Sequence, residues 1–266
     1  MTVHGLIVVC ALLALHVANA LAKPSKPPDC PLAVAEQVTV TAVIDGGSFE
    51  LEDGRRVRLA AIQAPMLSLG RSNVEDWPLA ADAKQYLSNL VLNRSIGLAF
   101  DERGTDRHGE VLAYVFVDGA REWLQSRLVS DGFARVNTRP DARKCAGALL
   151  ARESAARAAK RGIWAHPFYR VRQATELDGE IGTFQVVEGT VVSAVERRDR
   201  IYLNFGVDYR SDFTVTISPR DAKRMSKNGT NPLGWGAKRV RVRGWIALLN
   251  GPEMELTHPE QLEVLK

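Results

Sequence analysis

Cysteine is scarce in this chain, and the motifs of several common catalytic sites are absent from it. Three cysteines and five histidines occur among 266 residues, and none has the spacing of a zinc site. The sequence has no glycine-rich loop of the kind that holds a nucleotide phosphate, and no serine-triad motif. After residue 22 it has no apolar run long enough to cross a bilayer. These absences argue against a zinc enzyme, a P-loop enzyme, a serine hydrolase and a multi-span membrane protein.

The composition is that of a soluble globular protein, with 45% hydrophobic and 25% charged residues. The length permits one large domain or two small ones. The formal net charge is +4 and the isoelectric point is near 9.0. So small an excess of positive charge is only a weak indication of a nucleic-acid partner.

The first 22 residues have the pattern of a signal peptide. Residues 5–17 form an apolar run too short for a membrane span, and alanines follow at positions 18, 20 and 22. We expect cleavage after Ala20 or Ala22 and a secreted or periplasmic protein. Cleavage removes Cys10 and leaves Cys30 and Cys145, which we expect to pair in an oxidising compartment. The alternative is two separate buried thiols.

The rest of the chain divides into three parts after a proline-rich leader over residues 23–36. Residues 37–168 predict three strands, a helix over 79–92, two strands, a helix over 122–129 and a helix from Pro140 to Gly162. That order fits a five-stranded barrel with helices packed outside it. Residues 169–182 are expected to be a linker.

Residues 183–266 return to strand patterns and predict a second, smaller barrel of the OB type. Strands are expected over residues 184–195, 201–205, 213–217 and 240–248 and near 263–265, with one helix over 219–226. The predicted fold class is therefore α+β, with two β-barrels in tandem.

Three segments carry a resemblance to a known family. They are the turn Asp45-Gly46-Gly47-Ser48, residues 57–66, and residues 106–114. Together with scaffold residues such as Pro65, Gly109 and Trp164, they resemble the staphylococcal-nuclease (thermonuclease) family over residues 37–165. The resemblance implies an OB-fold barrel that cuts phosphodiesters with one calcium ion, two arginines and a glutamate base.

Most of the side chains that this chemistry needs are replaced here. Arg58 stands for the first arginine, but the two calcium carboxylates become Gly47 and Gln63, the base becomes Met66, and the second arginine becomes Glu110. Calcium is bound weakly without a carboxylate pair, and a thioether is not a base. A glutamate also repels a phosphate. We therefore expect no calcium, no other metal or cofactor, and no catalysis of the family type.

Two interpretations of the charged residues remain open. Arg58 either holds a phosphate or pairs with a nearby acid such as Glu110. Asp106, His108 and Glu110 form either a replacement metal or acid–base cluster or a solvated loop, and we favour the loop.

Another candidate surface lies in the C-terminal part. Alternation places Tyr202 on the polar face of its strand and places Arg239, Arg241 and Arg243 on one face of another strand. A tyrosine beside a basic stripe is typical of surfaces that bind nucleic acid. A solvated strand face is the simpler interpretation.

The main hypothesis is an exported thermonuclease-like protein without family-type nuclease activity, which binds nucleic acid or an envelope partner such as a protein or glycan. The competing hypothesis is an active metal-dependent DNA or RNA endonuclease with a rearranged site around Arg58, built from Asp45, Asp106 or Glu110. A third is a structural envelope protein. The oligomeric state is left open.

Overall fold

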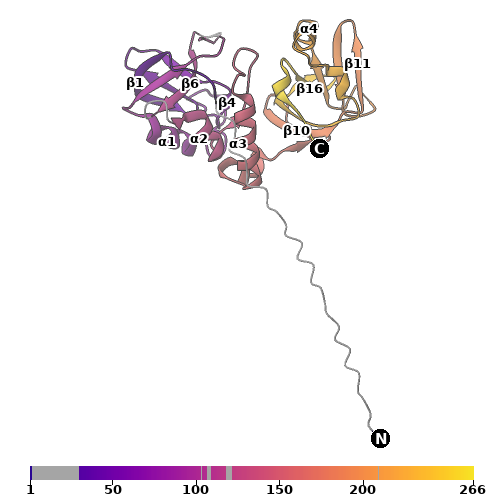
Figure 1. Cartoon of the computed structure of the whole chain (residues 1–266), viewed down its shortest axis with the longest axis horizontal. Coiled ribbons are helices and arrows are strands. Elements are labelled where there is room, and N and C mark those ends of the chain that lie inside the picture. The colour runs from indigo at the N-terminus through magenta and orange to yellow at the C-terminus, as the bar shows by residue number, and fades with distance from the viewer. Residues whose placement is uncertain (2–29, 103, 107–108, 118–121, 209) are drawn as a thin grey trace.

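The computed structural model (Figure 1) describes Met1 and residues 30–102, 104–106, 109–117, 122–208 and 210–266. Residues 2–22 of the expected signal peptide and residues 23–29 of the proline-rich leader lie outside the described residues. Within the described ranges, no helix is long and apolar enough to span a membrane.

The N-terminal part of the chain forms a closed five-stranded barrel, coloured indigo to magenta in Figure 1. Its strands pair in the order β3-β2-β1-β5-β6, and the pairing of β3 with β6 closes the ring. That closing pair is parallel and the other pairs are antiparallel, so the barrel is mixed. The predicted five-stranded barrel is confirmed. The strands are β1 (Glu36–Asp45), β2 (Ser48–Leu51), β3 (Arg56–Leu59), β5 (Ser95–Ala99) and β6 (Val111–Val117).

Helices and two-residue strands complete this part. The strand β7 (Glu122–Trp123) extends the sheet beside β6, and β4 (Ile62–Gln63) pairs with β8 (Arg135–Val136). The helix expected over residues 79–92 is confirmed as α1. The helix expected over residues 122–129 starts slightly later because residues 122–123 pair with β6. The helices are α1 (Ala80–Val91), α2 (Leu124–Ser130) and α3 (Ala146–Ala158), with the 3₁₀ turns η1 (Gly162–Ala165) and η2 (Pro167–Tyr169).

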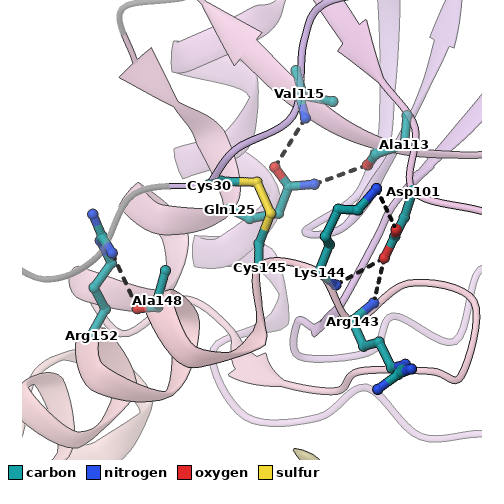
Figure 2. Close-up of a disulfide and its surroundings, with 10 residues drawn as sticks. All are labelled: Cys30, Asp101, Ala113, Val115, Gln125, Arg143, Lys144, Cys145, Ala148 and Arg152. Carbon is teal, nitrogen blue, oxygen red and sulfur yellow. Dashed lines mark hydrogen bonds and ion pairs between the residues drawn. A yellow bond between two sulfur atoms is a disulfide. The ribbon is translucent and has the colours of Figure 1, made fainter. Parts of the chain in front are cut away.

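The expected start of the third helix at Pro140 is wrong, because a turn precedes α3. The Asp101 carboxylate accepts hydrogen bonds from the backbone N–H groups of Arg143 and Lys144, each 2.8 Å long (Figure 2). These bonds connect residues 42 and 43 positions apart. Local helix propensity therefore does not reveal them.

The predicted disulfide between Cys30 and Cys145 is confirmed (Figure 2). It joins residues 115 positions apart, and their Cα atoms lie 4.9 Å from each other. Cys145 is buried, and Cys30 packs against the barrel core with Leu32 and Val34. The Ala35 N–H then donates to the Leu98 carbonyl, 2.8 Å away. The disulfide thus joins Cys30 to the residue just before α3, and the hydrogen bond of Ala35 joins the same segment to β5.

The C-terminal part contains two sheets, drawn in orange and yellow in Figure 1. The first has the strand order β17-β14-β10-β9 and the second the order β11-β12-β13-β16-β15. Neither sheet closes on itself, so the predicted second closed barrel is wrong. The strands are β9 (Arg172–Gln173), β10 (Phe184–Thr190), β11 (Ser193–Arg197), β12 (Arg200–Asn204), β13 (Thr214–Ile217), β14 (Arg239–Trp245), β15 (Ala247–Leu249), β16 (Gly251–Glu255) and β17 (Leu262–Val264).

Breaks in two long strands explain the difference. The chain leaves one sheet and joins the other between β10 and β11, and again at Ile246 between β14 and β15. Strand β16 is not evident from the sequence, because proline and glutamate are unusual in strands. The expected helix over residues 219–226 is confirmed as α4 (Pro219–Lys227), which Ser218 caps. Two short turns, η3 (Pro232–Trp235) and η4 (Pro259–Gln261), complete this part.

The segment expected as a linker, residues 169–182, is packed against both parts. Within it, β9 pairs with β10, and Tyr169 is buried in a cluster with Phe184. Arg135 of β8 lies in the same cluster, with its guanidinium carbon 4.8 Å from the Phe184 ring centroid and 5.1 Å from that of Tyr169. Arg135 Nη1 donates to the Phe184 carbonyl, 2.9 Å away. Burial lowers the pKa of Arg135 to about 10, which leaves it charged at neutral pH.

Candidate active site

The turn between β1 and β2 is held by the carboxylate of Asp45. Asp45 Oδ1 accepts hydrogen bonds from the Gly47 N–H, 2.8 Å away, and from Ser48 Oγ, 2.7 Å away. This is the Asx-type turn that an Asp-Gly sequence favours. A Cβ built on Gly47 would lie 3.6 Å from the Cβ of Ala64, so the turn faces the segment after β4. Because Gly47 has no side chain, it offers that segment no ligand atom beyond its backbone.

Arg58 lies on β3, beside Ser48 of β2 and Leu112 of β6 in the strand register. Its side chain is 55% exposed, and its Nε lies 3.3 Å from Oε2 of Glu110. Of the two interpretations of Arg58, the structure shows the ion pair with Glu110. An exposed pair of this kind stabilises a fold by at most about 1 kcal/mol. Its importance is that the Arg58 guanidinium already has a carboxylate as its neighbour.

The segment after β4 carries neither of the acids that the resemblance leads one to look for. Gln63 Nε2 donates to the carbonyl of Ala64, 2.9 Å away, so the amide turns back onto its own chain. The Met66 side chain is partly buried, and its carbonyl accepts a hydrogen bond of 2.8 Å from the Trp77 N–H. Gln63 and Met66 therefore supply one neutral oxygen and one thioether.

The oxygen donors at this site do not fit a calcium ion. Calcium takes six to eight oxygen ligands, with carboxylates among them. Here the only carboxylate on the turn is Asp45, and its Oδ1 already accepts two hydrogen bonds. Across the described residues, no group of three or more His, Cys, Asp or Glu residues could hold a metal ion.

Asp106 and Glu110, two charged residues before β6, are joined by hydrogen bonds. Asp106 Oδ1 accepts from the Glu110 N–H at 3.1 Å, and the Asp106 N–H donates to the Glu110 carbonyl at 2.8 Å. Gly109 completes the turn with φ of 80°, where glycine is favoured. Arg107 and His108 lie outside the described residues, so the hypothesis of an acid–base cluster with His108 stays a prediction.

The candidate residues of the C-terminal part lie on different strands and in different environments. Tyr202 of β12 is partly exposed, as alternation predicts, and faces away from the buried side of its strand. Arg239 and Arg241 of β14 both pair with Glu188 of β10, through contacts of 3.1 and 2.6 Å. Two of the three arginines thus have the same acidic neighbour. The basic stripe that alternation suggested therefore has an acidic residue beside it at both positions.

Arg243 is not at the surface. Its side chain is 1% exposed, and its Nη1 lies 2.6 Å from Oε2 of Glu153 on α3. Its Nη2 donates to Glu263 of β17. Burial disfavours the charge, but these two carboxylates outweigh burial and raise the pKa of Arg243. The expectation of a solvated strand face is therefore wrong for Arg243, which joins the two parts of the chain.

Comparisons with known proteins match part of this closed mixed barrel, including Arg58, to a known family. Residues 56–166 match the family described as "Staphylococcal nuclease homologue". The chain therefore carries a staphylococcal-nuclease family domain, homologous at modest identity to thermonucleases and to an endonuclease. Residues 183–266 lie outside the family match.

The relatives differ in how much of them the chain covers. The chain is 24% identical over 165 residues to a thermonuclease of Staphylococcus hyicus, covering 61% of this chain and 96% of that protein. It is 33% identical over 103 residues to endonuclease YncB of Bacillus subtilis (strain 168), covering 37% of this chain and 47% of that protein. It is 29% identical over 108 residues to a thermonuclease of Staphylococcus intermedius, covering 40% of this chain and 62% of that protein.

Two features of these surfaces were not predicted from the sequence. The first is the role of Asp45 in holding the turn, although Asp-Gly-Gly-Ser is a typical Asx-turn sequence. The second is the hairpin between β11 and β12, where Arg197 faces Arg200. Alternation on both sides of the pair Arg198-Asp199 was the signal that could have revealed this hairpin.

Proposed function

We propose that this protein is a thermonuclease homologue that binds its partner and does not hydrolyse phosphodiesters by the family's route. The observation that carries the proposal is the contact between Arg58 and Glu110, 3.3 Å long. The resemblance places a second phosphate-binding arginine at position 110. A carboxylate stands there instead, and it contacts the one arginine that remains.

The size of this electrostatic change supports the loss of activity. Two unit charges 4 Å apart interact by about 4 kcal/mol at an effective dielectric constant of about 20. Replacing a cation by an anion at that distance turns a stabilisation of this size into a repulsion. Because the Arg58 side chain is 55% exposed, solvent and salt screen part of this interaction, but the replacement still disfavours a bound phosphate.

The other replacements act on different steps, so they add to this loss. Gln63 and Gly47 leave no carboxylate pair for a divalent cation. Met66 cannot take a proton from an attacking water. The competing hypothesis of a rearranged metal site has no support from the donor geometry, because Asp45 holds its own turn and Glu110 pairs with Arg58.

Location and partner are part of the same proposal. The disulfide between Cys30 and Cys145 supports an oxidising compartment, and with the expected signal peptide it favours a secreted or periplasmic protein. The partner is nucleic acid or an envelope component. We further propose the division into a thermonuclease-like domain over residues 37–168 and a binding domain over residues 183–266.

A restoration experiment tests the proposal. The chain from Lys23 onward is incubated with single- and double-stranded DNA and RNA, in calcium or in chelator. We expect no cleavage by the wild type. The fourfold variant Gly47→Asp, Gln63→Asp, Met66→Glu and Glu110→Arg should gain calcium-dependent cleavage, because it restores each missing role. An aspartate is sterically allowed at position 47, where the nearest side-chain atom to a new Cβ is 3.6 Å away.

The control for this experiment is the fourfold variant with Arg58→Ala added, which should lose the gained activity. Calcium-dependent cleavage by the wild type, abolished by Arg58→Ala, would instead contradict the proposal.

A further inference from the structure

The hairpin between β11 and β12 places two arginines opposite each other. Arg197, the last residue of β11, lies directly opposite Arg200, the first residue of β12. Like charges facing each other across two strands destabilise the pairing. Within the described part of the chain, no ion pair joins either arginine to a carboxylate. The arginines of β14 differ in this respect, since each of them contacts Glu188 or Glu263.

The turn of this hairpin is also unfavourable for its residues. Arg198 has φ of 51° and Asp199 has φ of 63°. A two-residue turn with both φ angles positive normally uses asparagine and glycine. The chain therefore places an arginine in a strained turn between two facing arginines. Arg197, Arg198 and Arg200 thus lie together at the turn, with Asp199 among them, on the hairpin whose first strand Figure 1 labels β11.

The same face of the sheet continues with an aromatic ring and neutral polar groups. Tyr202 lies opposite Val195, and the next pair is Asn204 opposite Ser193. Directly paired residues share one face, so Tyr202 follows Arg200 on the side that carries Arg197. Asn204 Nδ2 donates to Ser193 Oγ, 2.9 Å away. One face of β11 and β12 thus carries, in order, the arginines, a partly exposed tyrosine, and amide and hydroxyl groups.

From this arrangement we propose that the outer face of β11 and β12 binds single-stranded nucleic acid. Arg197 and Arg200 pair with backbone phosphates through charge-assisted hydrogen bonds. Tyr202 stacks against a base, and Asn204 offers hydrogen bonds to base edges. The inference rests on the proposed function, because it names the partner of a protein that binds without cutting.

Acidic residues set the limit of this surface. Glu253 and Glu255 of β16 lie opposite Thr214 and Thr216 of β13, on the same face as Tyr202. The Thr216 hydroxyl donates to Glu253, 2.6 Å away. Because these carboxylates repel phosphates, the bound nucleic acid lies along β11 and β12 and not over β16.

Fluorescence anisotropy tests the inference with a labelled oligodeoxythymidylate of about 20 nucleotides, longer than one such site covers. The full chain from Lys23 is titrated at several salt concentrations. The double variant Arg197→Ala/Arg200→Ala should bind at least about 10-fold more weakly. Its plot of log K against log salt should lose about 1.4 of its slope, which corresponds to two phosphate contacts. Tyr202→Ala should bind roughly 5- to 100-fold more weakly with an unchanged slope.

The matched control removes the same charge elsewhere, in Arg94→Ala/Lys266→Ala, and should bind within about twofold of the wild type. All the altered side chains are exposed or partly exposed, and circular dichroism checks that each variant folds. Absence of binding at low salt overturns the inference. So does an equal loss in the control variant. Equal binding of heparin without any effect of Tyr202→Ala overturns it as well, because it shows a general polyanion surface.

The state of the oligonucleotide after the titration separates this inference from the proposed function. An intact but unbound oligonucleotide contradicts only the binding site. A cleaved oligonucleotide contradicts the proposed function.

Discussion

The buried ion pair between Arg243 and Glu153 leads to the most specific stability prediction. Each side chain is 1% exposed, and the Arg243 Nη1 and Glu153 Oε2 atoms are 2.6 Å apart. Glu153 also accepts a hydrogen bond of 2.7 Å from the Val136 N–H, which holds β8 in place. Arg243→Ala removes the main counter-charge of a carboxylate that water cannot reach.

The expected cost follows from the environment of the remaining carboxylate. Breaking a buried pair by removing one partner costs about 3–5 kcal/mol, because an uncompensated charge stays buried. Arg157, 3.4 Å from Glu153, offsets part of this cost. We expect Arg243→Ala to lower the free energy of unfolding by about 3 kcal/mol or more. In a chain of this size that corresponds to a decrease in melting temperature of roughly 6–12 °C.

Urea unfolding followed by tryptophan fluorescence measures this change. The matched control is Arg239→Ala on the same strand, whose side chain is 59% exposed and pairs with Glu188. It should lose at most about 1 kcal/mol. The double variant Glu153→Gln/Arg243→Met should lose less than the sum of its single variants, because it leaves no buried charge unpaired at these two positions. A loss for Arg243→Ala no larger than that for Arg239→Ala would show that the buried ion pair contributes no more to stability than the exposed one.

Three further predictions concern stability. Burial lowers the pKa of His258 from 6.5 to about 3, so the unfolded state binds more protons between these values. The contribution of His258 to the free energy of unfolding is therefore complete above pH 6.5 and falls by about 1.4 kcal/mol per pH unit toward pH 3. His258→Gln should remove this pH dependence from the free energy measured by urea unfolding. Replacing Cys30 and Cys145 with serine should cost roughly 3–5 kcal/mol in the same assay, whereas an unchanged midpoint would show that the disulfide contributes nothing. Gly132→Ala should cost about 3 kcal/mol or more, because Gly132 has φ of 77° and a Cβ there collides with the Arg161 carbonyl; a melting temperature equal to that of the wild type would contradict this.

The barrel was predictable from the sequence because its signals are local. Alternation in β1 and β2 and the Asp-Gly turns between strands indicate hairpins directly. The pairing of Arg58 with Glu110 was one of two interpretations, and the parallel register of β3 and β6 brings these two side chains together. The disulfide followed from the number of cysteines left after the signal peptide and not from any local pattern.

The environment of the arginines could not be predicted, because it depends on contacts between distant strands. Alternation alone gives the same pattern for Arg239, Arg241 and Arg243. Register with β10 brings Glu188 opposite Arg241, and packing against α3 buries Arg243 with Glu153. These contacts join residues 53 and 90 positions apart. For the same reason, the sequence did not show that the chain changes from one sheet to the other after β10 and after β14.

The central claim is that the barrel lacks the family's catalysis, and an initial-rate measurement tests it most directly. A single-stranded oligonucleotide with a fluorophore and a quencher is mixed with wild-type protein or with Arg58→Ala, in excess calcium. We expect both rates to equal the rate without protein. A calcium-dependent rate in the wild type that Arg58→Ala lowers by about 100-fold or more, the effect of losing a working phosphate ligand, would contradict it.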